Sequence, residues 1–322
     1  MSRAVSPQMP RRGRSVGRTP AVPSLPSVDD VFASAELFIR RNARLLEQRV
    51  FATVFRGAPA LGVVNAVRAY QNEDGGLGHA LEPDTRCPVS LPIYVETGLQ
   101  ALSIAGAVDV PLVTAACDFL GRAADDAGAG GAVALASPRI EDYPRAEHWT
   151  DWTYEPGLNP TAGLVGLLYD LDVDHPWRAA GTEYCWRQLE EAPLPDDAHA
   201  LSEVLVFLGH VPERERATEH AERVTAHLRG VPMFHLDPDT PGYGLSPLFI
   251  APLSTSPWRH LFTDAEMGAH LAHLVKTQQD DGGWPIAWEP PSPAATLEWR
   301  GLVTLQAMRS LVSYGRVPVP GV

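Results

Sequence analysis

Three glutamates lie in segments that are otherwise apolar. Glu96 lies in "YVETGLQAL", Glu203 in "LSEVLVFLG" and Glu298 in "PAATLEWRG". Burying an ionised carboxylate costs free energy unless it is paired or faces a cavity. If the three meet in one cavity, repulsion and desolvation raise at least one pKa above the ordinary glutamate value of about 4.3, and the acid can donate a proton near neutral pH. We expect this role first for Glu298; the alternative is a structural ion pair with Arg300 or another arginine.

A second group of reactive side chains lies in "HALEPDTRC" at residues 79–87. These side chains stand between a glycine-rich turn and an apolar segment, where they can face a cavity. The alternative is structural: Glu82 and Asp84 cap the helix that follows, and Cys87 belongs to the core.

Aromatic side chains accompany these acids. The set comprises Trp149, Trp152, Tyr243, Trp288 and Trp299. Aromatic faces can stabilise carbocations through their quadrupoles, stack on sugar rings or fill a core, so the set alone does not identify a substrate. The residues that we expect to contact a substrate are His79, Glu82, Asp84, His148, Trp149, Trp152, Trp288, Glu289, Trp299 and Arg300.

The elements that must position these residues are helices. From residue 28 onward, apolar residues recur at spacings of three and four almost everywhere, and strand-like alternation is nearly absent. The expected helices cover residues 29–55, 58–71, 90–105, 110–122, 159–171, 177–191, 196–208, 213–229, 262–279 and 294–313.

Two kinds of helix alternate along the chain. Four of the expected helices are apolar nearly all round, whereas the helix at 213–229 has a broad charged face. A helix of the first kind is buried on all sides, and one of the second kind meets water. The alternation predicts an inner layer of helices inside an outer layer, with the long irregular segments 123–158 and 231–261 folded over one mouth of the ring. The four apolar helices are 90–105, 159–171, 196–208 and 294–313.

The chain also carries an internal repeat. "QNEDGGLGHALEP" at residues 71–83 matches "QQDDGGWPIAWEP" at residues 278–290. Each copy begins near the end of an expected helix. The glycines can take positive φ and the Asp side chain can hold a backbone amide, so we expect each copy to form a tight corner that joins helix pairs.

The second copy resembles the Gln-Trp repeat of the terpenoid cyclase and protein prenyltransferase superfamily. Because its members are α/α toroids, the resemblance implies that residues 28–315 form an all-α ring of five to six helix pairs. Similar Asp-Gly-Gly corners occur in sugar-cleaving toroids, in epimerases and in the thioester-containing complement fragment. The repeat therefore indicates the fold more strongly than the function.

The same resemblance directs attention to a third acidic segment, "YDLDVDHPW" at residues 169–177. Terpenoid cyclases that start by protonation use a DxDD motif whose central aspartic acid donates the proton. Asp172, Asp174 and the intervening residue match this motif, and His175 replaces its last Asp. The alternative is a turn that caps the next helix.

The resemblance to zinc-dependent prenyltransferases bears on cofactors. Those enzymes use Asp, Cys and His ligands, and Asp84, Cys87 and His79 supply these residue types. However, the family takes its ligands from separate repeats, whereas these three residues lie in one segment. The sequence therefore gives little support to zinc, and it leaves magnesium open as a cofactor.

Composition limits the domain organisation and the partners. The chain of 322 residues is 45% hydrophobic and has a net charge of −13, which disfavours nucleic acid as a partner. Residues 1–27 are rich in Pro, Ser and Arg, so we expect a disordered basic arm followed by a single domain over 28–322. The three cysteines are widely spaced, which predicts buried, reduced thiols. Without a long apolar run or an export signal, we expect a cytoplasmic protein.

Three functions remain open on the sequence alone. The first is a terpenoid cyclase-like enzyme, in which an acid in the central cavity protonates an isoprenoid and tryptophans stabilise the cation. The second is a carbohydrate-active toroid, namely a glycoside hydrolase, lyase or epimerase that uses paired carboxylates. The third is a binding module without catalysis. The expected partner is a small apolar isoprenoid, and contact with a membrane surface is a further expectation.

Overall fold

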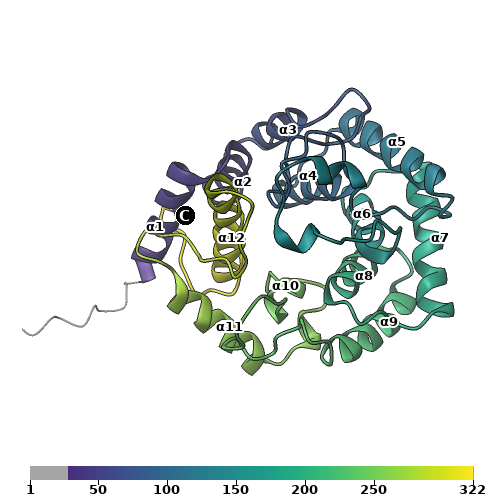
Figure 1. Cartoon of the computed structure of the whole chain (residues 1–322). Coiled ribbons are helices and arrows are strands. Elements are labelled where there is room, and N and C mark those ends of the chain that lie inside the picture. Colours follow the sequence, from purple (N-terminus) through teal and green to yellow (C-terminus); the bar gives the residue numbers. More distant parts are fainter. Residues whose placement is uncertain (1–27, 322) are drawn as a thin grey trace, which may run out of the picture.

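The computed structural model describes residues 28–321, and the expected arm at 1–27 lies outside the described residues. The described chain alternates between an outer and an inner ring of helices (Figure 1). The outer helices are α1 (Val28–Asn42), α3 (Leu61–Arg68), α5 (Val110–Ala127), α7 (Pro176–Glu191), α9 (Arg214–Leu228) and α11 (Asp264–Thr277). The inner helices are α2 (Leu45–Arg56), α4 (Pro92–Ala105), α6 (Leu158–Asp170), α8 (Ala198–His210), α10 (Pro247–Ile250) and α12 (Pro293–Ser313).

The architecture is the α/α toroid that the sequence predicts, and the described part of the chain forms six helix pairs. Each outer helix leads into an inner helix, so the inner helices all begin at one end of the ring. We call this end the mouth. The outer-to-inner connections form it, at residues 43–44, 69–91, 128–157, 192–197, 229–246 and 278–292.

The helix expected over residues 29–55 is wrong in one respect, because the structure breaks it into α1 and α2. Arg44, which stands between them, takes an extended backbone conformation with φ −64° and ψ 164°. Its guanidinium donates to the Leu81 carbonyl oxygen at 2.7 Å and pairs with Glu47 at 2.5 Å. The break therefore ties the first helix pair to the loop at residues 69–91.

The expectation for the segment 231–261 is also wrong in part, because the four residues of α10 divide it. The part before α10 lies at the mouth. The part after α10 lies at the opposite end of the ring, where the Tyr314 hydroxyl donates to the carbonyl oxygens of Ala251 and Leu253 at 2.9 and 3.0 Å. The segment at 128–157, which contains the short 3-10 turns η1 (Pro138–Asp142) and η2 (Glu147–Trp149), belongs to the mouth as expected.

The repeated corners couple each helix pair to the next outer helix. The side-chain amide of Gln71 donates to the Gly75 carbonyl oxygen at 2.9 Å and to that of Leu112 in α5 at 3.1 Å. The amide of Gln278 donates to the corresponding oxygens of Gly282 and of Val31 in α1, at 2.9 and 3.0 Å. Each glutamine thus closes its own turn and holds the neighbouring outer helix. The two corners occupy equivalent places, as the repeat predicts.

The corner glycines are required by space as well as by conformation. Gly75 and Gly282 have φ of 86° and 90°. A Cβ on Gly75 would lie 2.5 Å from the Ala115 carbonyl oxygen, and one on Gly282 would lie 2.2 Å from that of Ser34. Both distances are too short for any side chain, so the outer helices can approach this closely only at glycine.

A third corner has no glutamine or aspartate signature in the sequence. Gly131 has φ of 100°, and a Cβ there would lie 2.7 Å from the Ala180 carbonyl oxygen of α7. Two residues later, the backbone amide of Val133 donates to the Thr161 hydroxyl at 3.0 Å. The second repeat has the same arrangement, in which the Trp284 amide donates to the Thr304 hydroxyl at 3.1 Å. The corner geometry therefore recurs where the motif does not.

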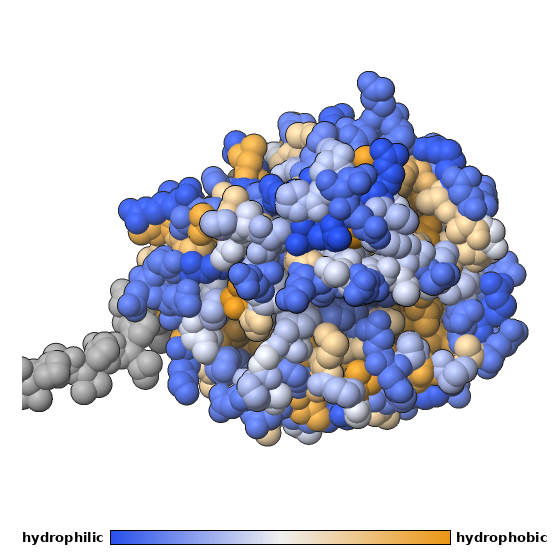
Figure 2. Space-filling model, in the orientation of Figure 1, coloured by the Kyte–Doolittle hydropathy of each residue, from blue (hydrophilic) through white to orange (hydrophobic). Residues whose placement is uncertain are grey.

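The surface and the burial of the thiols complete the description of the ring. The face in Figure 2 is mostly hydrophilic, and side chains close the centre of the ring on that face. Within residues 28–321, no helix combines the length and the apolar character that crossing a bilayer demands. Cys87, Cys117 and Cys185 are buried free thiols, as expected, and burial raises the pKa of Cys117 to about 12.

We predict that Gly282→Ala lowers the free energy of unfolding by at least about 3 kcal/mol, because it adds a clash with α1 to the cost of a positive φ. Gly57→Ala is the matched control. Gly57 has φ of 64°, but no atom lies within 4 Å of the position its Cβ would take. Gly57→Ala should lower the free energy of unfolding by only about 1–2 kcal/mol. Urea unfolding measures both, and equal losses would contradict the role of close approach at the corner.

Candidate active site

Glu96 and Glu203 meet on the inner side of α6. Each lies in the second turn of its inner helix, in α4 and α8 respectively, and the two carboxyl groups are hydrogen-bonded to each other. They meet at Gly163 of α6, where a Cβ would lie 1.7 Å from Glu203 Oε2 and 2.7 Å from Glu96 Oε1. The missing side chain at Gly163 therefore makes the space that the carboxyl groups share. We call Glu96 and Glu203 the acid pair.

The surroundings of the acid pair favour its protonated form. Burial raises the pKa of Glu96 well above its ordinary value, and the charge of Glu203 raises it further. Burial also raises the pKa of Glu203, although the hydrogen bond with Glu96 lowers it. Glu96 Oε1 and Glu203 Oε2 are buried, and within residues 28–321 no group outside the pair donates a hydrogen bond to either atom. Two carboxyl groups in this arrangement titrate as a coupled pair, so the pair as a whole is the candidate acid.

A second buried carboxyl group lies nearby at the mouth. Asp84 Oδ1 accepts hydrogen bonds from the indole N–H groups of Trp288 at 3.1 Å and Trp299 at 2.7 Å. His148 Nε2 lies 3.6 Å from Asp84 Oδ2. Burial raises the pKa of Asp84, and His148 and the two indoles act against that rise. Oδ1 is fully engaged as an acceptor, so Oδ2 is the atom that faces a ligand or holds a proton.

Backbone contacts fix the loop that carries Asp84. The Asp84 carbonyl oxygen accepts from the Ala146 amide at 2.7 Å, and the Arg86 amide donates to Pro144 at 2.9 Å. These bonds join residues 69–91 to the segment 128–157. The Asp84 amide in turn donates to Glu82 Oε2 at 3.1 Å. The alternative in which Glu82 and Asp84 cap the next helix is wrong, because no side chain caps α4.

An aromatic series links Asp84 to the acid pair. Trp288 packs edge-on against Trp299 and Tyr243, with ring centroids 5.0 and 5.2 Å apart. Tyr243 stacks on His199 at 5.7 Å, and its hydroxyl lies 2.8 Å from His199 Nε2. His199 precedes Glu203 by four residues in α8, which places both on one face, and its charge lowers the pKa of Glu203.

These residues form one site that opens to solvent. We call its outer part the mouth cluster, which comprises Asp84, His148, His199, Tyr243, Trp288 and Trp299. The His148 side chain is 49% exposed and that of Asp84 is 7% exposed, so the cluster runs from the surface to a buried carboxyl group. Trp149 is buried and packs on Trp152 at 4.9 Å beneath His148, which makes this pair a support for the cluster.

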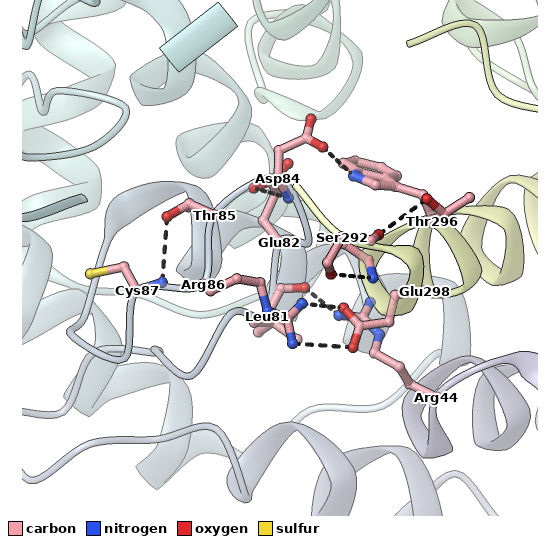
Figure 3. Close-up of polar contacts among 12 residues, drawn as sticks. Arg44, Leu81, Glu82, Asp84, Thr85, Arg86, Cys87, Ser292, Thr296 and Glu298 are labelled. Atoms are coloured by element: carbon pink, nitrogen blue, oxygen red, sulfur yellow. Dashed lines mark hydrogen bonds and ion pairs between the residues drawn. The ribbon is translucent and has the colours of Figure 1, made fainter. Parts of the chain in front are cut away.

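Glu298, the acid that the sequence favours, does not join the acid pair. Its carboxylate forms an ion pair with Arg86, with Nη1 and Oε2 2.5 Å apart (Figure 3). Only Glu203 contributes charge to the pKa of Glu96. The expectation that Glu298 is the proton donor is therefore corrected in favour of its alternative, an ion pair with an arginine from elsewhere. That pair anchors the loop at residues 69–91 to α12.

Asp172 and Asp174 also lie away from the site. They belong to the loop between α6 and α7, at the end of the ring opposite the mouth, and both are exposed. Asp174 pairs with Arg178 at 2.7 Å, and His175 Nδ1 accepts from the Trp177 amide at 3.1 Å to cap α7. The DxDD interpretation is therefore wrong, because the motif lies away from the acid pair. The alternative of a turn and helix cap is confirmed.

Three expected substrate contacts have other surroundings. Arg300 pairs with Asp281 at 2.7 Å and donates to the Trp284 carbonyl oxygen at 3.1 Å, so it braces the second corner. Glu289 and His79 are exposed. Within residues 28–321, no three His, Cys, Asp or Glu side chains converge as metal ligands would.

Sequence reasoning missed His199 and Gly163. The signal for His199 was its spacing of four residues before Glu203 on an inner helix, which puts both side chains on one face. The signal for Gly163 was an isolated glycine within an apolar helix, which indicates close approach by another group. Neither signal identifies Tyr243 as the partner of His199 or the acid pair as the neighbour of Gly163, because those residues come from other parts of the chain.

Comparison with known proteins supports the fold. No protein-family model matches the chain, and no curated protein matches its sequence significantly. The crystal structure of a protein from Actinoplanes aligns with a TM-score of 0.57 at 17% identity, over 90% of this chain and 100% of that one. The apo structure of the type II terpene cyclase MstE from Scytonema aligns with a TM-score of 0.49 at 12% identity, over 89% and 98%. The first likeness shows a shared fold, and the second is too weak to indicate more.

We predict that Glu96→Gln stabilises the protein at pH 8 by on the order of 1 kcal/mol and that this gain disappears as the pH falls toward about 4.5. The folded protein keeps a proton on Glu96 that the unfolded chain loses above its ordinary pKa. The free energy of unfolding of the native protein therefore falls as the pH rises from about 4.5 to 8. That of Glu96→Gln does not fall in this way, because the variant has no proton to lose at this position. Urea unfolding across the range measures it. The exposed Glu289→Gln is the control, and parallel pH curves for Glu96→Gln and the native protein would contradict the shared proton.

Proposed function

We propose that the protein is an enzyme that protonates a small apolar molecule of the isoprenoid class and guides the resulting cation to a cyclised or rearranged product. The observation that carries this proposal is the acid pair. The pKa values of Glu96 and Glu203 are raised above those of ordinary glutamates, and Glu203 is half-buried whereas Glu96 is buried. A retained proton on an accessible acid is what a general acid requires.

The chemistry begins with transfer of that proton to a carbon–carbon double bond. The π electrons form the new C–H bond, and the neighbouring carbon becomes a cation. The π electrons of a second double bond can then close a ring. Trp288, Trp299 and Tyr243 provide aromatic surfaces that favour positive charge, and Asp84 adds a carboxyl group beside them.

The reaction ends when a carbon next to the cation loses a proton and its C–H electrons form a new double bond. Burial lowers the pKa of His148, and the charge of Asp84 acts against this shift. His148 is therefore neutral near pH 7 and can accept the proton. The sum of the steps is an isomerisation, because one proton enters and one leaves. His199, whose side chain is 34% exposed, connects Glu203 to solvent for reprotonation.

A carbohydrate-active enzyme is the second candidate, favoured by the polar rim of the mouth cluster. Asp84, His148, His199 and Tyr243 offer hydrogen bonds that a sugar could use. Glycosidases, however, separate their two carboxyl groups by about 5 Å or more so that one protonates and the other attacks. The acid pair is directly hydrogen-bonded, which suits one shared acid better than two divided roles.

The test is an assay with linear isoprenoids and their diphosphates beside a panel of oligosaccharides, with and without magnesium, with products identified by mass spectrometry. We predict conversion of an isoprenoid. Glu203→Gln and Asp84→Asn should each lower its rate by at least about 100-fold, the usual contribution of general acid catalysis and of charge stabilisation.

Asp172→Asn is the control, because this residue lies at the opposite end of the ring, and it should leave the rate unchanged. Circular dichroism verifies that each variant is folded. Conversion of a sugar, or an isoprenoid rate that Glu203→Gln leaves intact, would overturn the proposal.

A further inference from the structure

A pocket of about 340 Å³ lies at the end of the ring opposite the mouth. Its walls come from the last turns of three inner helices, α2, α4 and α12, and from the connection that follows α10. The size falls within the range of small-molecule sites, roughly 300–1,000 Å³. The wall residues used below are Val54, Phe55, Ile104, Leu253, Arg309 and Val312.

All of these wall residues except Arg309 are apolar. The arginine enters from α12, one turn before the helix ends, and is partly buried in the pocket. It makes no hydrogen bond or ion pair with any other residue in the described part of the chain. Most half-buried arginines here are engaged, as Arg86 is with Glu298 and Arg229 is with Glu266. Burial lowers the pKa of Arg309, and no carboxylate raises it.

A half-buried cation without a counter-charge lowers stability, because it loses part of its hydration and gains no partner. Such a group persists where a ligand supplies the missing charge. The apolar walls set a second requirement, since they gain free energy only from an aliphatic or similarly apolar body. A single ligand that meets both requirements has an anionic head group and an apolar tail.

We infer that this pocket binds a small amphiphile with a carboxylate or phosphate head group, with the head group on Arg309 and the aliphatic tail along Val54, Phe55 and Ile104. The site is separate from the acid pair and the mouth cluster, which lie at the other end of the inner helices. The inference therefore does not rest on the proposed function.

The experiment is isothermal titration of the full chain with octanoate, octyl phosphate and 1-octanol at pH 8, where the first two are anionic. The three probes have aliphatic tails of nearly equal length, so differences in their affinity report the contribution of the head group. We expect both anions to bind at least about tenfold more tightly than 1-octanol, since a hydrogen bond to a charged group contributes about 1.5–3 kcal/mol. Arg309→Met should remove this difference and leave octanol binding in place.

Two further variants keep the result interpretable. Arg41→Met removes an exposed arginine of the outer helix α1 and should leave the affinity for octanoate unchanged. Val54→Trp fills the pocket from its exposed rim while keeping Arg309, and should abolish binding of all three probes even if Arg309→Met fails to fold. Equal affinity for octanoate and 1-octanol, octanoate binding that survives Val54→Trp, or no octanoate binding at about 1 mM would overturn the inference.

Discussion

Closure of the ring depends on close backbone contact at the outer-to-inner corners. At each repeated corner, a glutamine amide bonds both its own turn and the next outer helix, and a glycine in the left-handed region lets the two backbones touch. The corner at Gln278 carries the greatest consequence, because its partner Val31 lies in the first helix of the chain. This contact joins the last helix pair to the first. The packing of α12 on α1 and α2 completes the closure.

The closed ring brings together residues that the chain keeps far apart. Asp84 receives hydrogen bonds from Trp288 and Trp299, more than 200 positions later in the sequence. The inner helices all begin at the mouth, so the second turns of α4 and α8 lie at the same depth as Gly163 in α6. Glu96 and Glu203 can therefore meet across the helix that separates them. Position along the inner helix, set by the corners, decides which side chains share a space.

The site holds its buried carboxyl groups by two different physical means. Asp84 is surrounded by donors, so two indole N–H groups and His148 offset part of the cost of its burial. The acid pair lacks such donors, so it retains a proton instead. Burial therefore raises the pKa of carboxyl groups at both ends of the site, and at Asp84 the two indoles and His148 act against that rise. Carboxyl groups with raised pKa values are typical of acid–base sites.

The helical class, the two layers, the place of the repeated corners and the candidate acids can all be inferred from the amino-acid sequence. Those features are local, since periodicity, capping and turn chemistry act between residues a few positions apart. The third corner at Gly131 escaped detection because only its glycine is retained there. Tertiary structure alone decided the partners of each acid. Glu96, Glu203 and Glu298 occupy alike positions in apolar helices, yet Glu298 meets Arg86 while the other two meet each other over Gly163. That choice rests on the neighbours that ring closure supplies, and a pKa depends on those neighbours more than on the sequence around the group.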